Sequence, residues 1–368
     1  MNKALGAVFA AVFLFSVVQD ARALDVAATL TEAFALLAKG DSDAALRAAD
    51  AALKAAPTDP EAYHCRFRVY LARAQDEEAL ADINRAIELQ AASAKYLAAR
   101  AELRLAKQEY DAATKDLDAA LAADETYAAA VRLRAELRLR QGRPDLALED
   151  AERAVRLAPD DAAAYLVRGD ALAATRRYKD ARADYVKATD LDPGNAKAWH
   201  SLGRHDFLQA NAYARAIKSL DKAIALDPDA APAYVVRAKA KLAAGGSSNR
   251  AAALEDLAAA IRLDPASAEA HYVRAGAARA AEDYAAAVAD LRKALALEPK
   301  NAGYRALWNT IYGEDSERLM AEAEKLLNDG KYAAAAGRVR KALEIDPRSG
   351  PLNEALRIIE RHREKRGK

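Results

Sequence analysis

The residues best suited to chemistry are five histidines and one cysteine, and their spacing fits neither a metal site nor a catalytic one. The histidines are His64, His200, His205, His271 and His362, and none lies in an H-E-x-x-H or zinc-finger pattern. His200 and His205 are five residues apart, so they are not neighbours on one helical face. Because Cys65 is the single cysteine, an intrachain disulfide and a cysteine-based metal site are both excluded.

The richest polar cluster surrounds two of these histidines. It consists of Trp199, His200, Arg204, Asp206 and Phe207. We interpret it as partner contacts or ordinary helix surface rather than as a catalytic site. The chain has no phosphate-binding glycine loop, dinucleotide fingerprint or nucleophile elbow. We therefore predict no enzyme, no catalytic residue, no cofactor and no bound metal, and we expect Cys65 to be a small buried residue rather than a redox thiol.

Composition favours helices and gives no attraction to polyanions. Lys and Arg number 56 and Asp and Glu 55, so no long-range field draws the chain to nucleic acid. Apolar residues make up 52% of the chain but aromatic residues only 6%, and alanine, the strongest helix former, dominates. This is the composition of a helical array.

A short sequence motif recurs along the chain at a nearly fixed interval. It consists of a small residue and an aliphatic residue, followed a few residues later by proline. The closing prolines are Pro57, Pro159, Pro193, Pro228, Pro265, Pro299 and Pro347. Pro57 and Pro159 are 102 residues apart, which is three times 34. The two closing positions between them are occupied by Ala91 and Glu125 instead of proline. The following steps are 34, 35, 37 and 34 residues, and the last is 48. Proline suits this place because it disfavours helix in the residue before it.

A period of 34 residues with two helices per interval resembles the tetratricopeptide repeat. The match is strongest at 196–228, where Trp199, Leu202 and Gly203 reproduce the W-x2-L-G spacing, although Asp206 stands where the family has tyrosine. The resemblance implies an all-α fold, a right-handed α-solenoid of about nine helix-turn-helix repeats with a C-terminal capping helix. In such a fold, each helix pair buries its apolar face against its neighbours.

The first residues read as a targeting segment. Lys3 precedes an apolar run from Ala4 to Val18, and Ala21-Arg22-Ala23 forms a small-x-small site. This pattern is typical of a secretory signal peptide cleaved after Ala23, with a retained anchor as the alternative. We expect five segments: a signal peptide at 1–23, repeats one to eight at 24–299, an irregular extra helix at 300–312, the last repeat at 313–347, and a capping helix with a basic tail at 348–368.

A charge pattern travels with the repeat. If each closing proline is position 32, six units carry arginine at position 7 and aspartate at position 23. The pairs are Arg66 and Asp82, Arg100 and Asp116, Arg134 and Asp150, Arg168 and Asp184, Arg237 and Asp256, and Arg274 and Asp290. In the last unit the charges are exchanged, as Glu322 and Arg338. We predict a partly buried ion pair between the two helices of each unit, with a structural role in register.

The resemblance also implies a concave groove lined by the first helix of each repeat. Positions 2, 5, 9, 12 and 13 of the first helix, called the groove positions below, should face it. The candidate contacts are His64, Arg68, Glu102, Arg132, Glu136, Arg140, Asp170, Lys197, His200, Arg204, Phe207, Tyr272 and Arg279. This lining is mixed in charge, which favours an extended partner surface over one tight carboxylate pocket.

Three places depart from the pattern. Gly245 to Asn249 carries three extra residues and predicts a longer surface loop, a tolerated insertion rather than a binding loop. Residues 300–312 predict one extra helix, after which Glu314-Asp315-Ser316 should begin the next helix. Residues 350–365 predict a last helix whose charged outer face caps the array, with contact to anionic partners as the alternative.

These features together predict an exported protein-protein interaction scaffold that binds peptides or other proteins in its groove. The location would be the bacterial periplasm or the exterior, without membrane insertion after cleavage and without nucleic acid. The alternative is a non-catalytic accessory subunit of an envelope enzyme or of a secretion or assembly complex. The oligomeric state is left open, since solenoid ends can self-associate.

Overall fold

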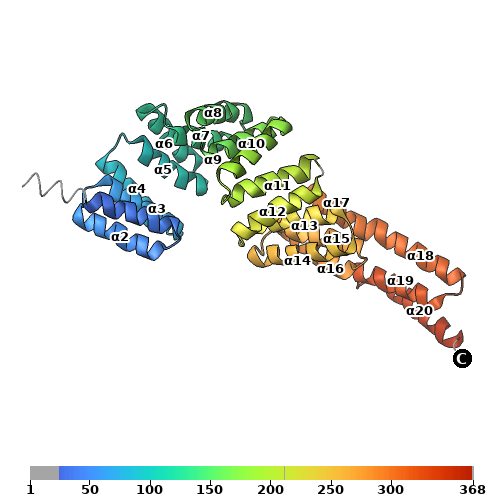
Figure 1. The fold of residues 1–368 in the computed structure, drawn as a ribbon. Helices are drawn as coiled ribbons and strands as arrows, with labels where there is room; N and C mark the ends of the chain where they lie inside the picture. The colour runs from blue at the N-terminus through green and yellow to red at the C-terminus, as the bar shows by residue number, and fades with distance from the viewer. Residues whose placement is uncertain (1–24, 211, 367–368) are drawn as a thin grey trace, which may run out of the picture. The chain divides into compact units, whose positions relative to one another are not determined.

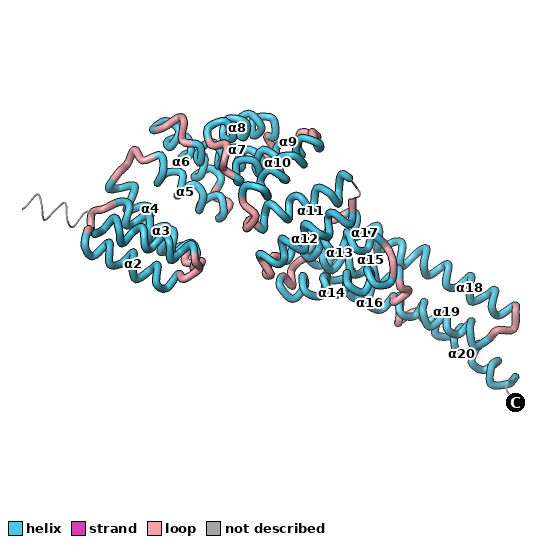
Figure 2. The backbone as a smooth tube through the Cα atoms, viewed as in Figure 1, coloured by secondary structure: helices cyan, strands magenta, loops and turns pink. Residues whose placement is uncertain are grey.

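A computed structural model describes residues 25–210 and 212–366, and every regular element in these two ranges is helical (Figure 2). The predicted all-helical repeat fold is confirmed. The chain forms two compact units, one ending at Leu191 and the other beginning at Asp192. The expected signal peptide at 1–23 lies outside the described residues.

The first unit is a series of helix pairs joined by short turns (Figure 1). It contains a helix at 25–38, then α2 Ser42–Ala55, α3 Pro60–Ala72, α4 Asp76–Leu89, α5 Ala94–Ala106, α6 Tyr110–Ala123, α7 Ala128–Arg140, α8 Pro144–Leu157, α9 Ala162–Ala174 and α10 Tyr178–Leu191. Each first helix packs most extensively on the second helix of its own repeat, and α5, α7 and α9 also contact one another in sequence.

The second unit repeats the arrangement and ends in a capping helix (Figure 1). It contains α11 Ala196–Ala210, α12 Tyr213–Leu226, α13 Ala231–Ala244, α14 Ser247–Leu263, α15 Ala268–Ala280, α16 Tyr284–Leu297, α17 Ala302–Asn309, the π-helix η1 Thr310–Asp315, α18 Ser316–Asn328, α19 Tyr332–Ile345 and α20 Gly350–Arg366. Among the described helices, none has both the length and the apolarity needed to cross a bilayer.

Small residues set the spacing of the paired helices. A Cβ atom on Gly169 would lie 2.7 Å from the ring of Tyr185, and one on Gly203 would lie 2.7 Å from Cγ of Leu220. At the equivalent place in other repeats, Ala238 and Ala275 are fully buried. At these two glycines the paired helices therefore approach so closely that an added side chain would have to displace the residue facing it.

The turn between the two helices of a repeat reverses the chain through one left-handed residue. The residue at position 15 has a positive φ in seven repeats, and these residues are Gly40, Ala74, Gln108, Gly142, Arg176, Glu282 and Gly330. Its neighbours close the turn, as where the amide of Gln75 donates to the carbonyl of Tyr70 at 2.9 Å. Glycine adopts this backbone freely, whereas the four other residues adopt it at a cost of about 1 kcal/mol.

In three repeats, an aromatic side chain at position 4 binds the carbonyl of the closing proline just before its own helix. Trp199 donates its indole N–H to the carbonyl of Pro193 at 2.9 Å. The hydroxyls of Tyr63 and Tyr234 bind the carbonyls of Pro57 and Pro228 at 3.2 and 3.1 Å. The closing proline thus ends one helix and also accepts a hydrogen bond from the next repeat.

The predicted loop at Gly245 to Asn249 is wrong. Only Gly245 and Gly246 interrupt the helices, and both have positive φ. The three extra residues instead lengthen α14 to 17 residues, against 14 in α12 and α16. Ser247 to Asn249 therefore add a helical turn, and two left-handed glycines suffice to reverse the chain.

The helix α18 begins at Ser316, within the predicted start at Glu314 to Ser316, but no break in the helical path precedes it. Residues 302–328 follow one helical path, in which α17 runs through η1 into α18. Asp315 has helical φ and ψ values of −71° and −38°, and no side chain caps α18. Its buried carboxylate accepts hydrogen bonds from Arg279 at 2.6 and 3.2 Å, so a distant partner holds it within the helix.

Candidate functional site

The ion pairs within repeats share one geometry in both units. Nε and Nη2 of the arginine donate to the two carboxylate oxygens of the aspartate, at 2.6 to 3.0 Å. The pairs are Arg66–Asp82, Arg100–Asp116, Arg134–Asp150, Arg168–Asp184, Arg237–Asp256 and Arg274–Asp290. The exchanged pair Arg338–Glu322 also forms, at 2.9 Å. The aspartates are almost fully buried, so each depends on its arginine for compensation.

A second cation joins three of these aspartates from position 11. Arg104 lies 2.6 Å from Asp116, Arg138 lies 2.6 Å from Asp150, and Lys241 lies 2.8 Å from Asp256. In the sequence, these cations all occupy position 11 of the repeat. Their recurrence at that position in units that carry aspartate at position 23 is the signal that could have linked them to the aspartates. In the sixth repeat, Asp206 occupies position 11 instead, is buried, and lies 3.5 Å from Arg215.

The groove positions of α3 and α5 form a polar cluster around Glu61. Lys95 lies 2.5 Å from one carboxylate oxygen, and the hydroxyl of Tyr96 donates to the other at 2.9 Å. The buried ring of His64 lies 3.7 Å from the carboxylate and close to the ring of Tyr96. His64, Lys95 and Tyr96 outweigh the effect of burial and hold the pKa of Glu61 down at about 2.

The other polar groove positions of the first unit are also engaged within the chain. Arg68 of α3 binds Glu102 of α5 at 3.2 Å, and Arg140 binds Glu136 within α7 at 2.9 Å. Nε of Arg132 lies 3.5 Å from the carboxylate of Asp161 but has no hydrogen-bond partner in the described structure, and Nδ1 of His64 also has none. Asp170 accepts a hydrogen bond from the hydroxyl of Tyr185 at 2.8 Å. The Arg68–Glu102 and Tyr185–Asp170 contacts therefore join neighbouring helices, whereas Arg140 and Glu136 pair within one helix.

In the second unit, Lys197 and His200 line a cavity of about 230 Å³ between α11 and α13. Pro232 and Ala233 of α13 form its other side. Nε2 of His200 is buried and has no hydrogen-bond partner. Burial and the nearby charge of Arg204 lower the pKa of His200, so the imidazole is neutral at pH 7 and can donate or accept one hydrogen bond.

A second cavity, of about 370 Å³, lies between α13 and α15. It is lined at groove positions by Leu242, Tyr272 and Gly276, and also by Leu307 of α17. Tyr272 stacks on Tyr304, with ring centroids 4.7 Å apart. The wall of this cavity is therefore mainly apolar, with one phenol ring and the charged side chain of Arg250.

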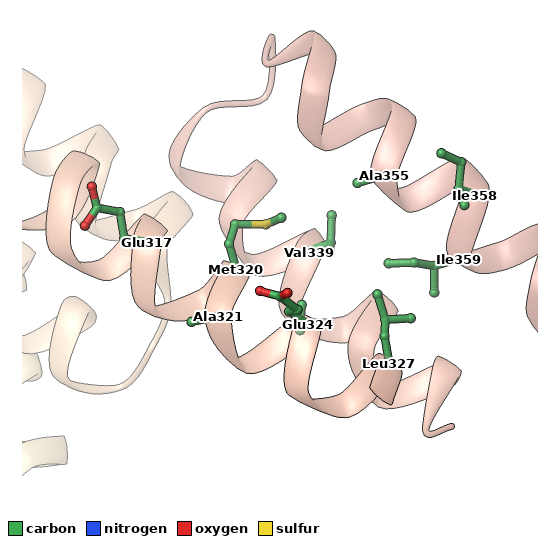
Figure 3. A pocket seen from close by; sticks show the side chains of 10 residues that line it. Glu317, Met320, Ala321, Glu324, Leu327, Val339, Ala355, Ile358 and Ile359 are labelled. Carbon is green, nitrogen blue, oxygen red and sulfur yellow. The ribbon is translucent and has the colours of Figure 1, made fainter. Parts of the chain in front are cut away.

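A third cavity, of about 600 Å³, lies between α18 and α20 (Figure 3). Its wall on α18 consists of Glu317, Met320, Glu324 and Leu327, which are positions 2, 5, 9 and 12 of the last repeat. None of these four residues was among the candidate contacts predicted from the sequence, although they occupy the same groove positions of the repeat.

Of the remaining candidates, Arg204 is exposed on α11 and Phe207 packs near Tyr213, at 6.1 Å between ring centroids. Arg279 is bound to Asp315, so its guanidinium ties α15 to η1. Cys65 is fully buried, and burial raises the pKa of its thiol to about 12. Within residues 25–210 and 212–366, no three His, Cys, Asp or Glu side chains are grouped as a metal site would need.

A chain of helix pairs at a near-constant interval, with small residues between the paired helices, defines a helical repeat protein. Residues 98–162, 132–196 and 242–302 match the family model described as Tetratricopeptide repeat. These parts of the chain are tetratricopeptide repeats.

Solved structures share this fold. PilF of Pseudomonas aeruginosa is 19% identical, and the match covers 58% of this chain and 96% of that one with a TM-score of 0.50. PilW, described as a widely conserved type IV pilus biogenesis factor, is 21% identical, with coverage of 58% and 97% and a TM-score of 0.51. Comparison with curated proteins gave no match.

Proposed function

We propose that this chain is an exported interaction scaffold that binds peptides or proteins at the groove positions of its second unit and has no catalytic role. The observation that carries the proposal is the pair of cavities between first helices of adjacent repeats, at α11–α13 and α13–α15. Both are lined by groove positions, so a partner lying across the first helices would contact both.

The polar features of these cavities suit a peptide. The unpaired Nε2 of His200 can bind a backbone amide or carbonyl, and Lys197 beside it can bind an acidic side chain or a carboxylate. The mainly apolar cavity at Tyr272 can take an aliphatic or aromatic side chain.

A pull-down from envelope extracts tests this proposal. The bait is the wild-type chain or the variant Lys197→Glu with His200→Glu, and captured proteins are quantified by mass spectrometry. The matched control is Lys218→Glu with Lys222→Glu, which changes exposed lysines on the second helix α12 of the same repeat. We expect partners that the groove variant loses and the control keeps. Partners retained equally by all three forms would exclude the groove at α11.

Export is supported by the basic start, the apolar run and the small-x-small site at Ala21 to Ala23. Intact-mass measurement of the chain from the native envelope checks it. A mature form that begins at Leu24 is expected, whereas a full-length form recovered from the cytosol would refute export.

The second candidate function is an accessory subunit of an envelope assembly or secretion complex. PilW, a pilus biogenesis factor, has the same fold, and this motivates the alternative without identifying a partner. The pull-down separates the two candidates, because an accessory subunit would capture one stable complex in fixed proportion.

A further inference from the structure

The cavity between α18 and α20 is an open apolar groove at the end of the array (Figure 3). Met320 and Leu327 form its wall on α18, Val339 of α19 lies at its base, and Ile358 and Ile359 form its wall on α20. Ile358 is 47% exposed, which makes it one of the most exposed large apolar residues of the described chain. A surface of this kind is stabilised when another apolar surface covers it.

The α18 rim of this groove is acidic and lacks compensation. Glu317 and Glu324 are seven residues apart and exposed, and within residues 25–210 and 212–366 neither has a cation at ion-pair distance. In the first unit, by contrast, Glu61 and Glu102 at groove positions each bind a cation from the adjacent repeat. In the last groove, the described residues of α20 take the place of a first helix and supply no such cation to Glu317 or Glu324.

The α20 rim carries the opposite charge. Arg357 and Arg361 are exposed, and because they are four residues apart they project from the same side of the helix, beside Ile358. Arg357 lies 3.6 Å from Glu354, with 71% of its side chain exposed. One patch of the chain therefore contains an acidic row, an exposed isoleucine and a basic row.

We propose that this patch binds a second copy of the chain. In a twofold arrangement, α20 of each copy places Ile358 against the groove of the other, and Arg357 and Arg361 face Glu317 and Glu324 across the interface. A twofold interface uses the same patch on both copies, so a patch with both charges in separate rows is self-complementary. This assembly is independent of partner binding at α11–α15, which lies elsewhere in the second unit.

Sedimentation of the full mature chain with exchanged charges tests the proposal. One variant carries Glu317→Lys and Glu324→Lys, which replaces the acidic row of its patch with a second basic row. The other carries Arg357→Glu and Arg361→Glu, which makes its patch wholly acidic. The substitutions are at exposed positions, and circular dichroism checks that both variants keep their helices. The matched control is Lys218→Glu with Lys222→Glu on α12.

We expect a concentration-dependent dimer for the wild type and the control, and at least a tenfold weaker dimer, roughly, for each variant alone. Mixing the two variants should restore dimers, because a basic patch then meets an acidic one. A wild type that stays monomeric from micromolar to near-millimolar concentration overturns the proposal and assigns the groove to another occupant. Variants that dimerise as the wild type does, or that do not recover on mixing, overturn it as well.

Discussion

Equivalent groove positions behave differently in the two units. In the first unit, Glu61 and Glu102 bind Lys95 and Arg68 of the adjacent repeat. In the described part of the second unit, Lys239 and Glu269 form such a pair, and three cavities lie between first helices and the helices that follow them. The Arg–Asp pairs within repeats are alike in both units. The comparison indicates that the repeat scaffold and the groove surface are specified by separate residues.

The largest expected effect is on the shared scaffold. Asp116→Ala leaves Arg100 and Arg104 without their buried partner, and we expect a loss of about 3 to 5 kcal/mol in the free energy of unfolding. Asp256→Ala in the second unit removes the partner of two cations in the same way, and its loss should be similar. Urea titration followed by circular dichroism measures both. If one of the two losses in the free energy of unfolding is less than half of the other, the buried ion pairs do not stabilise the two units in the same way.

Two glycines should respond to alanine with opposite signs. In the first unit, Gly169→Ala places a Cβ 2.7 Å from the ring of Tyr185, and we expect it to lower the free energy of unfolding by about 1 to 3 kcal/mol. In the second unit, Gly276 lines a cavity, and a Cβ there meets no atom within 4 Å. Gly276→Ala should stabilise by about 0.5 to 1 kcal/mol through helix propensity. Thermal unfolding measures both, and a destabilising Gly276→Ala would contradict the open cavity.

Acid should affect the first unit through Glu61. Its folded pKa of about 2 is lower than the ordinary 4.5, so its stabilisation is fully present above about pH 5 and is lost as the pH falls toward 2. We expect Glu61→Gln to cost about 1 to 2 kcal/mol at pH 7, discounted for the partly exposed carboxylate, and almost nothing near pH 2.

The matched control for this acid effect is Glu317→Gln, at the same groove position of the last repeat. It should change the free energy of unfolding by less than about 0.5 kcal/mol at pH 7, because the described structure gives Glu317 no ion pair to lose. Urea titrations at several pH values compare the two variants. Equal costs at pH 7 would erase the contrast between the units.

The smallest expected effect concerns the left-handed turn residue. Gln108→Gly in the first unit should stabilise by about 0.5 to 1 kcal/mol, since Gln108 has a φ of 61° and glycine adopts this backbone without strain. Glu282 has a φ of 57° in the second unit, but its carboxylate lies 2.9 Å from Arg338. Glu282→Gly should therefore gain nothing. Differential scanning calorimetry checks both, and equal gains would show that the Arg338 contact contributes no stability.

The sequence was sufficient to predict the fold and the partners of the buried aspartates. Position 23 is aspartate wherever position 7 is arginine, and the structure places these groups in contact. The second cation at position 11 follows from the same numbering. These features repeat, so each copy of the unit gives independent support.

The features that were not predicted depend on contacts outside the repeat. Asp315 resembles a helix start, but Arg279, 36 residues earlier, binds it within a continuous helix. Gly245 to Asn249 resembles a loop because serine and glycine are common in loops, yet serine and asparagine also begin helices. Cavities such as the one at His200 depend on the packing of side chains from three helices, which no local pattern encodes.

The positions of the two tryptophans, one of which is the Trp199 that binds Pro193, have a consequence for spectroscopy. Trp199 and Trp308 are the two tryptophans of the chain, and both lie in the second unit. Fluorescence excited at the red edge of absorption, where tyrosine does not contribute, therefore follows the second unit alone, whereas circular dichroism follows helices in both. Denaturation curves recorded by the two methods should coincide if the units unfold together and separate if each unfolds by itself. The chain thus contains its own spectroscopic label for one half of the molecule.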